Sequence, residues 1–182
     1  MLTVISLTSS HFDRWSEHLY RHLAESGKHG LPLFSPIEDV SLASSPERRT
    51  RFETSVDIPI HQPGWMRVWA VEATGGSLIA HVDLTGSTIP SEKHRATVGI
   101  GCERNFHRQG LGRTLMKRAI EFAVENRIEW IDLFVFGENT VALALYKSFG
   151  FAEIGRRADR FRIAGRSVDD VMMTLHVPLA AQ

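Results

Sequence analysis

The chain has 182 residues, of which 43% are hydrophobic and 23% are charged. Such a length and composition suit one soluble globular domain with a full core, so we expect residues 1–182 to form a single domain. Lysine plus arginine and aspartate plus glutamate both total 21, so no overall field favours nucleic acid or an anionic membrane as a partner.

Cysteine content and apolar runs limit the class of protein further. Cys102 is the single cysteine, which excludes an intrachain disulfide framework and fits a reducing compartment. The apolar run at residues 2–7 lacks a basic flank and is too short for a signal peptide. No run approaches the roughly 20 apolar residues of a membrane span. We therefore predict a cytoplasmic protein without a membrane partner.

The N-terminal half shows apolar periodicity broken by turn residues, which predicts alternating strands and helices. In chain order we expect a strand at 2–7, a helix from Ser9 or Ser10 to near Gly27, an irregular segment at 28–44, a helix start at 45–47, and a hairpin of strands 65–72 and 78–84 around Gly75 and Gly76. The irregular segment carries several apolar side chains, and we expect it to form part of the wall around an acceptor substrate.

The C-terminal half predicts two strand–helix units followed by a pair of strands. Apolar residues recur at helical spacing after Gly110 and again after Asn139, and residues 130–136 form an apolar run of buried-strand length. We expect a strand ending at Cys102, a helix from Gly110, a strand at 130–136, a helix from Asn139 to Phe149, and strands at about 151–162 and 168–177.

The most informative segment is the polar loop that leads into the helix at Gly110. A helix start carries unpaired N–H groups and a partial positive charge, so it attracts phosphates, and glycines at 110 and 112 allow a bulky diphosphate to reach the main chain. A P-loop needs Gly and Lys where His107 and Arg113 stand. A dinucleotide fingerprint needs Gly where Leu115 stands. The loop itself indicates a phosphate-bearing ligand.

Two sequence blocks resemble those of the GCN5-related N-acetyltransferases (GNAT). The loop His107-Arg108-Gln109-Gly110-Leu111-Gly112 resembles the family's Q/R-x-x-G-x-G/A motif, with His at the first position. Residues 139–151 resemble its N-x-x-A-x-x-L-Y-x-x-x-G-F segment. The order of predicted elements also matches the family's coenzyme-binding core, from about 96 to 157. The ending at 165–173 is similar to bacterial acetyltransferases that act on small amines and amino acids.

The resemblance implies a fold and a coenzyme. The fold is α/β (α+β): a mixed, mostly antiparallel sheet of about seven strands flanked by helices, with a splayed parallel strand pair that admits acetyl-CoA. Backbone N–H groups of the loop hold the pyrophosphate, and a backbone N–H near Cys102 polarises the thioester carbonyl. The residues implied in coenzyme binding are Ile100, Gly101, Cys102, His107, Arg108, Gln109, Gly110, Leu111, Gly112, Arg113, Asn139 and Tyr146.

Tyr146 matches the family tyrosine beside the coenzyme sulfur, which implies a general acid for the departing thiolate; the alternative is a tyrosine that packs one edge of its helix. Asn139 is either a helix N-cap or a residue close to the pantetheine. Cys102 is not expected to act as a nucleophile, because no Cys–His signature accompanies it and the family resemblance implies direct transfer.

The general base is the least determined role. Many relatives carry Glu on the strand before the loop, where Thr97 stands here. An amine of pKa near ~10.4 must lose a proton before it attacks, so another group has to accept it. Asp83 and His81 alternate on one strand face and are our base candidates. His94, Glu103 and a chain of water molecules are the alternatives.

Other charged groups have simpler interpretations. His18 and His22 have the i, i+4 spacing of a zinc pair, but Leu19 replaces the glutamate of the zincin pattern, and we predict no metal. The arginines of the C-terminal strands are interpreted as a solvated, salt-paired face, with an acidic substrate or partner as the alternative.

The predicted activity is N-acetyl transfer from acetyl-CoA to a primary amine of a small molecule or amino acid, by direct attack in a ternary complex. The first alternative is a non-catalytic acyl-CoA sensor, which the threonine at 97 favours and Tyr146 opposes. The second is a nucleotide hydrolase, which lacks its lysine. Relatives commonly dimerise, so a homodimer is also considered.

Overall fold

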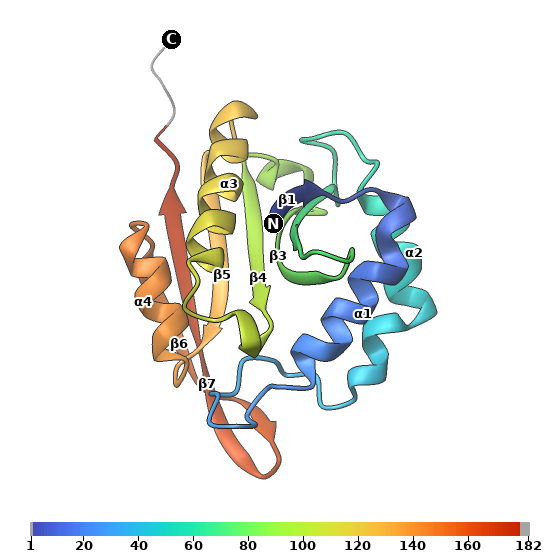
Figure 1. Ribbon diagram of the computed structural model, residues 1–182. Helices are drawn as coiled ribbons and strands as arrows, with labels where there is room; N and C mark the ends of the chain where they lie inside the picture. Colours follow the sequence, from blue (N-terminus) through green and yellow to red (C-terminus); the bar gives the residue numbers. More distant parts are fainter. Residues whose placement is uncertain (1, 179–182) are drawn as a thin grey trace.

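The computed structural model describes residues 2–178 and contains one seven-stranded sheet in the order β1-β2-β3-β4-β5-β7-β6 (Figure 1). All neighbouring strands are antiparallel except β4 and β5, so the predicted mixed, mostly antiparallel α/β fold is confirmed. The strands are β1 (Thr3–Ser6), β2 (Met66–Glu72), β3 (Leu78–Gly86), β4 (Arg95–Cys102), β5 (Trp130–Phe136), β6 (Ala152–Ile163) and β7 (Arg166–His176). The helices are α1 (Phe12–Leu23), α2 (Pro46–Ser55), α3 (Leu111–Glu125) and α4 (Thr140–Ser148), with 3-10 turns η1 (Ser9–His11), η2 (Val40–Ser44), η3 (Pro90–Glu92) and η4 (Arg104–Phe106).

The first helix is shorter at both ends than its sequence pattern predicts. Residues 9–11 form the separate turn η1, in which the Thr8 N–H donates to Nδ1 of His11 at 3.1 Å. This local contact competes with the α-helical pattern, so α1 begins at Phe12. At the other end, Gly27 adopts φ +70° and its N–H bonds the Pro32 carbonyl at 3.1 Å, which belongs to a turn that follows α1.

Helices cover both faces of the sheet because the side chains of each strand alternate between them. Val68 and Ala70 of β2 belong to a core cluster with residues of α1 and α2. Trp69 and Val71, their neighbours in sequence, belong to a second cluster with α3 and α4. Figure 1 shows α3 lying along β4, with α1 and α2 together on the other side of the molecule.

The parallel strands β4 and β5 are joined at one end and separate at the other. They pair at residues 95–97 and 130–132, where Arg95 forms a bidentate ion pair with Asp132 (2.8 and 2.7 Å). On their other edges β4 pairs with β3 through Cys102 and β5 pairs with β7 through Phe136, whereas the pairing between β4 and β5 ends at Thr97 and Asp132. The two strands are therefore unpaired toward their C-terminal ends, as the splay implied by the family resemblance requires, and this separation forms a gap between them.

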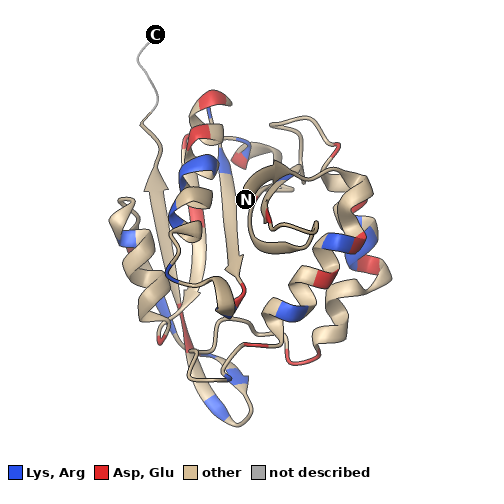
Figure 2. Cartoon of the chain, in the orientation of Figure 1, with Lys and Arg blue, Asp and Glu red and all other residues tan. Residues whose placement is uncertain are grey.

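Charged side chains of both signs are interspersed along α1, α2 and α3 (Figure 2). The formal net charge is zero, so the surface offers no uniform field to a polyanion. Within residues 2–178, every helix is too short or too polar to cross a bilayer.

Candidate functional site

The gap between β4 and β5 is lined on one side by the free backbone edge of β4. The Glu103 N–H donates to the Ile79 carbonyl at 3.0 Å, and hydrogen-bonded pairs alternate along an antiparallel ladder. By this alternation Gly101 directs its backbone groups to β3, whereas Ile100 and Cys102 direct theirs into the gap. The Cys102 carbonyl accepts a hydrogen bond from Nε2 of His107 at 2.9 Å, so its N–H is the group left for a ligand.

The glycine loop lies where the gap meets the start of α3. Gly110 adopts φ +80°, and a Cβ there would meet nothing within 4 Å. A Cβ on Gly112 would lie 3.3 Å from Cδ2 of Leu145 on α4 and 4.0 Å from Cδ1 of Ile100, which places the loop beside both α4 and β4. Within the described chain, the N–H groups of residues 108–113 have no acceptor. They form a set of donors suited to a diphosphate.

Helix α4 lies beside the glycine loop, because its Leu145 approaches Gly112. The Asn139 side chain accepts from the Ala142 N–H at 3.2 Å, so the N-cap interpretation is observed, and its contact with a coenzyme stays a prediction. Tyr146 is buried against Phe151, and its hydroxyl forms no hydrogen bond within residues 2–178. Burial, with a contribution from the Asp83 carboxyl, raises the pKa of Tyr146, so the phenol stays protonated and can donate a hydrogen bond.

His81 and Asp83 lie on one face of β3, directly opposite Gly101 and Gly99 of β4. His81 Nε2 and Asp83 Oδ1 are 3.9 Å apart. A Cβ on Gly99 would lie 2.6 Å from Asp83 Oδ1, and a Cβ on Gly101 would lie 2.6 Å from both His81 Cε1 and His22 Nε2. The two glycines therefore provide the space that the polar side chains occupy.

Gly101→Ala is expected to lower the free energy of unfolding by about 1–3 kcal/mol, because two buried imidazoles would have to move. Gly137→Ala is the matched control: its Cβ would lie 2.5 Å from an Arg156 guanidinium nitrogen, which is the end of a flexible surface side chain. We expect a change within about 0.5 kcal/mol for the control. Urea unfolding of both variants measures the difference, and equal losses would contradict the role given to Gly101.

The protein environment shifts the pKa values of the two base candidates, Asp83 and His81, in opposite directions. Burial raises the pKa of Asp83 to about 6, although the charges of Arg51 and Arg48 and a hydrogen bond from Thr85 act in the opposite direction. Burial, followed by the nearby His18, holds the pKa of His81 well below its usual value. At neutral pH Asp83 is thus an ionised carboxylate with enhanced basicity, and His81 is a neutral imidazole.

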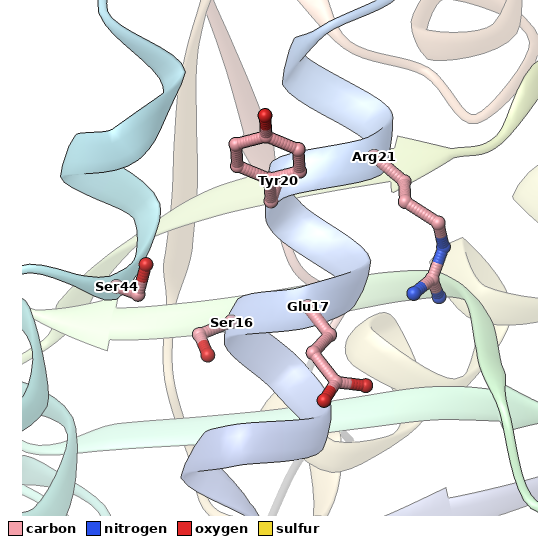
Figure 3. A pocket seen from close by; sticks show the side chains of 5 residues that line it. All are labelled: Ser16, Glu17, Tyr20, Arg21 and Ser44. Carbon is pink, nitrogen blue, oxygen red and sulfur yellow. The ribbon is translucent and has the colours of Figure 1, made fainter.

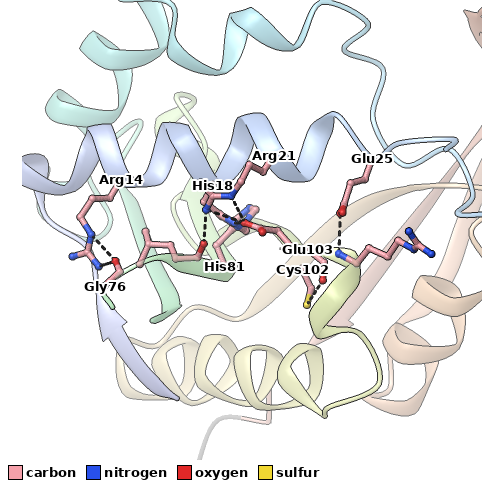
Figure 4. A network of polar contacts seen from close by, with 10 residues as sticks. Arg14, His18, Arg21, Glu25, Gly76, His81, Cys102 and Glu103 are labelled. Atoms are coloured by element: carbon pink, nitrogen blue, oxygen red, sulfur yellow. Dashed lines mark hydrogen bonds and ion pairs between the residues drawn. The ribbon is translucent and has the colours of Figure 1, made fainter. Parts of the chain in front are cut away.

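Two histidines of α1 join this face, which sequence reasoning did not anticipate. His18 is fully buried and its Nε2 lies 2.9 Å from Nδ1 of His81 (Figure 4). His22 stacks on Phe34 of the segment 28–44, with ring centroids 4.6 Å apart, and its Nδ1 is buried without a hydrogen-bond partner. The sequence signal for their burial was that both histidines lie on the apolar face of the helix. Within residues 2–178, no group of three or more His, Cys, Asp or Glu is arranged to hold a metal ion.

Of the remaining base candidates, Glu103 contacts the buried histidines, whereas His94 lies elsewhere. Glu103 is mostly buried and its Oε1 lies 2.8 Å from His18 Nδ1. The His94 carbonyl accepts the N–H groups of Glu129 and Trp130, which places His94 beside the joined end of β4 and β5. Thr97 is exposed at that same end. Burial raises the pKa of Cys102 to about 12, so it remains a thiol, and the expectation that it is not a nucleophile stays a prediction.

A surface hollow lies on the outer side of α1 and is lined by Ser16, Glu17, Tyr20, Arg21 and Ser44 (Figure 3). None of these residues belongs to the gap or to the His81–Asp83 face. The hollow touches the site through Arg21, whose guanidinium bonds Glu103 at 3.0 Å.

Comparisons with known proteins agree with this geometry. The model of the acetyltransferase (GNAT) family matches residues 36–151. N-alpha-acetyltransferase RimI of Mycobacterium tuberculosis is 33% identical over 94 residues (50% of this chain, 56% of that protein), and L-amino acid N-acetyltransferase AaaT of Escherichia coli is 30% identical over 83 residues (44% and 51%). The chain thus spans about half the length of the curated relatives it matches. The structure of yncA from Salmonella typhimurium with its cofactor acetyl-CoA superimposes with a TM-score of 0.78 at 16% identity, covering 100% of this chain and 97% of that one.

Proposed function

The chain belongs to the acetyltransferase (GNAT) family, and from this premise we propose that it is an acetyl-CoA-dependent N-acetyltransferase. The observation that carries the proposal is the gap between β4 and β5, which opens beside a glycine loop with free N–H donors. The residues fit the coenzyme: the loop donors of residues 108–113 suit its pyrophosphate, and the free edge of β4 at Ile100 and Cys102 suits its pantetheine amides.

The proposed acceptor is the primary amine of a small molecule or amino acid. Asp83 offers a carboxylate to the ammonium group, and the positive charges of Arg48 and Arg51 act on that same carboxylate. An amino acid carries an ammonium and a carboxylate group, so its ammonium can pair with Asp83 while its carboxylate faces the arginines. The relative AaaT is by name an L-amino acid N-acetyltransferase. A peptide α-amine is the competing acceptor, since RimI is by name an N-alpha-acetyltransferase.

In the proposed reaction the amine attacks the thioester carbonyl directly. Asp83 accepts the proton of the ammonium group, because its raised pKa makes it basic near neutral pH. The Cys102 N–H donates to the carbonyl oxygen, where negative charge develops. Tyr146 donates a hydrogen bond to the departing sulfur, whose thiol pKa near ~8.5 makes it a good leaving group. As the amide forms, its nitrogen loses a second proton, which the departing thiolate takes up to become the free thiol.

The function is tested by incubating the protein with acetyl-CoA and a panel of amino acids, polyamines, aminoglycosides and short peptides. Acceptor-dependent release of coenzyme A, with a product heavier by one acetyl group, is the expected result for amino acids or small amines. An enzyme-alone control accounts for the Cys102 thiol in the assay. Acetyl-CoA binding without transfer to any acceptor would favour the non-catalytic sensor.

Tyr146→Phe is expected to lower kcat about tenfold and leave the KM for acetyl-CoA within about twofold, because the ring packing remains and the hydrogen bond to sulfur is lost. Steady-state kinetics with the acceptor found above measures both constants. An unchanged kcat would remove Tyr146 as the proton or hydrogen-bond donor. A raised KM at constant kcat would assign it to coenzyme binding instead.

We also propose that residues 1–182 form one domain, on the ground that one sheet contains every strand of residues 2–178. The homodimer and the cytoplasmic location are also predictions. Size-exclusion chromatography with light scattering tests the dimer directly.

A further inference from the structure

We propose that Glu103 and His18 are positioning residues that hold His81 as the tautomer protonated on Nδ1, so that its unprotonated Nε2 and the Asp83 carboxylate together receive the ammonium group of the acceptor. This proposal rests on the proposed function and deepens it by assigning the acceptor's binding site. It gives a role to two buried groups that the transfer reaction itself does not use.

The geometry is a chain of three side chains from three separate elements. Glu103 Oε1 lies 2.8 Å from His18 Nδ1, and His18 Nε2 lies 2.9 Å from His81 Nδ1 (Figure 4). His18 is fully buried and His81 is 6% exposed, so water does not compete for these ring nitrogens. The remaining nitrogen, His81 Nε2, faces Asp83 Oδ1 at 3.9 Å.

The carboxylate fixes the direction of every hydrogen bond in this chain. An ionised carboxylate accepts and cannot donate, so His18 must carry its proton on Nδ1. When His18 is neutral, its Nε2 is an acceptor and His81 must donate from Nδ1. His81 Nε2 is then bare. Burial alone would raise the pKa of Glu103, but hydrogen bonds from His18 and Arg21 leave it lowered, which keeps the carboxylate ionised.

Glu103 already has a cationic partner besides His18. Arg21 pairs with Glu103 at 3.0 Å from the same helix. His18 itself is fully buried and lies beside the rings of His22 and His81, with centroids 6.1 and 5.1 Å away. A charge on the fully buried His18 ring would cost more in desolvation than it gains from a carboxylate that is already paired.

Burial is the largest effect that favours the neutral form of His81. Arg48 on α2 would repel a charged imidazole, and His18 and His22 on α1 would add to that repulsion when they themselves are charged. Gly101 of β4 presents no side chain, and among residues 2–178 Asp83 on β3 is the one acid beside the free nitrogen. Arg51 also acts on the Asp83 carboxylate, and that carboxylate in turn acts on the Tyr146 phenol.

Two acceptors 3.9 Å apart suit a primary ammonium, which has three N–H donors. One donor binds Asp83 and a second binds His81 Nε2. The proton bound toward Asp83 then passes to its carboxylate, the nitrogen lone pair becomes free to attack, and His81 holds the amine in place through the other N–H. If His81 carried its proton on Nε2, that N–H would point at the ammonium and oppose binding.

Glu103→Gln tests the assignment, because the amide has the size of the carboxylate but can donate as well as accept. In the wild type, nitrogen-15 NMR of the imidazoles is expected to show His81 protonated on Nδ1 and bare on Nε2 throughout pH 6–8. In the variant the hydrogen-bonded chain of side chains can also run in the opposite direction, so both His81 tautomers form. The nitrogen-15 signals of the two His81 ring nitrogens are therefore expected to average. Glu17→Gln on the outer face of α1 is the control and is expected to leave the His81 signals unchanged.

Kinetics gives the second readout. Glu103→Gln is expected to raise the KM for the acceptor and to lower kcat, so that kcat/KM for the acceptor falls about tenfold. The KM for acetyl-CoA is expected to stay unchanged. A wild-type His81 protonated on Nε2, or wild-type tautomers in Glu103→Gln, would overturn the proposal. The NMR measurement requires no turnover, so a wild-type protein with the expected tautomer and no transfer to any amine would overturn the proposed function alone.

Discussion

Gly110→Asp is expected to weaken acetyl-CoA binding about a hundredfold, which corresponds to about 3 kcal/mol. The side chain would project into open space in front of the free N–H groups of residues 108–113, where the pyrophosphate is proposed to bind. A carboxylate there both repels the phosphates and competes for their donors. Isothermal titration with acetyl-CoA measures the effect.

Gly110→Asn separates charge from backbone strain. Asp and Asn both tolerate the left-handed conformation that φ +80° requires, and they have nearly the same size. The neutral variant is expected to bind acetyl-CoA within about tenfold of the wild type. Equal weakening by both variants would identify strain as the cause, and wild-type affinity in Gly110→Asp would remove the loop from the coenzyme site.

Asp83→Asn is expected to lower kcat by about a hundredfold or more, because the amide cannot accept the proton of the ammonium group. The wild-type kcat/KM for the acceptor is expected to fall as the pH drops below about 6, where Asp83 becomes protonated. This acidic limb should be missing from the residual activity of the variant. A wild-type limb that persists in Asp83→Asn would assign the base to another group.

The same substitution should stabilise the fold, which distinguishes a lost catalytic group from a damaged structure. Folding raises the pKa of Asp83 from its ordinary value of 3.8 to about 6, so the folded state holds the proton more tightly than the unfolded state. Stability therefore decreases as pH rises from about 4 to about 6 and stays lowered above that range. Relative to the wild type, Asp83→Asn is expected to gain about 1–3 kcal/mol at pH 7 and little near pH 4, as measured by urea unfolding.

The local signals in the sequence determined the elements and the coenzyme loop. Strand β5 at 130–136, the hairpin of β2 and β3, and the start of α3 at Gly110 follow from periodicity and from turn residues, which act over a few neighbours in the chain. The first helix is the exception, since the hydrogen bond between Thr8 and His11 separates a turn from it. Such a contact depends on rotamers that a residue pattern does not specify.

The tertiary structure alone decided which polar groups meet. His18 and Glu103 are 85 residues apart, and His18 and His81 are 63 apart, so no local pattern joins them. The sequence presented His18 and His22 as a spaced pair and Glu103 as one base candidate among several. Their alignment depends on α1 packing across β3 and on glycines at 99 and 101 that leave room beneath it. Strand pairing and packing fix those positions through contacts between residues that are distant in the sequence. For this reason the His81–Asp83 face could be recognised only in the fold, whereas the glycine loop could be recognised in the sequence.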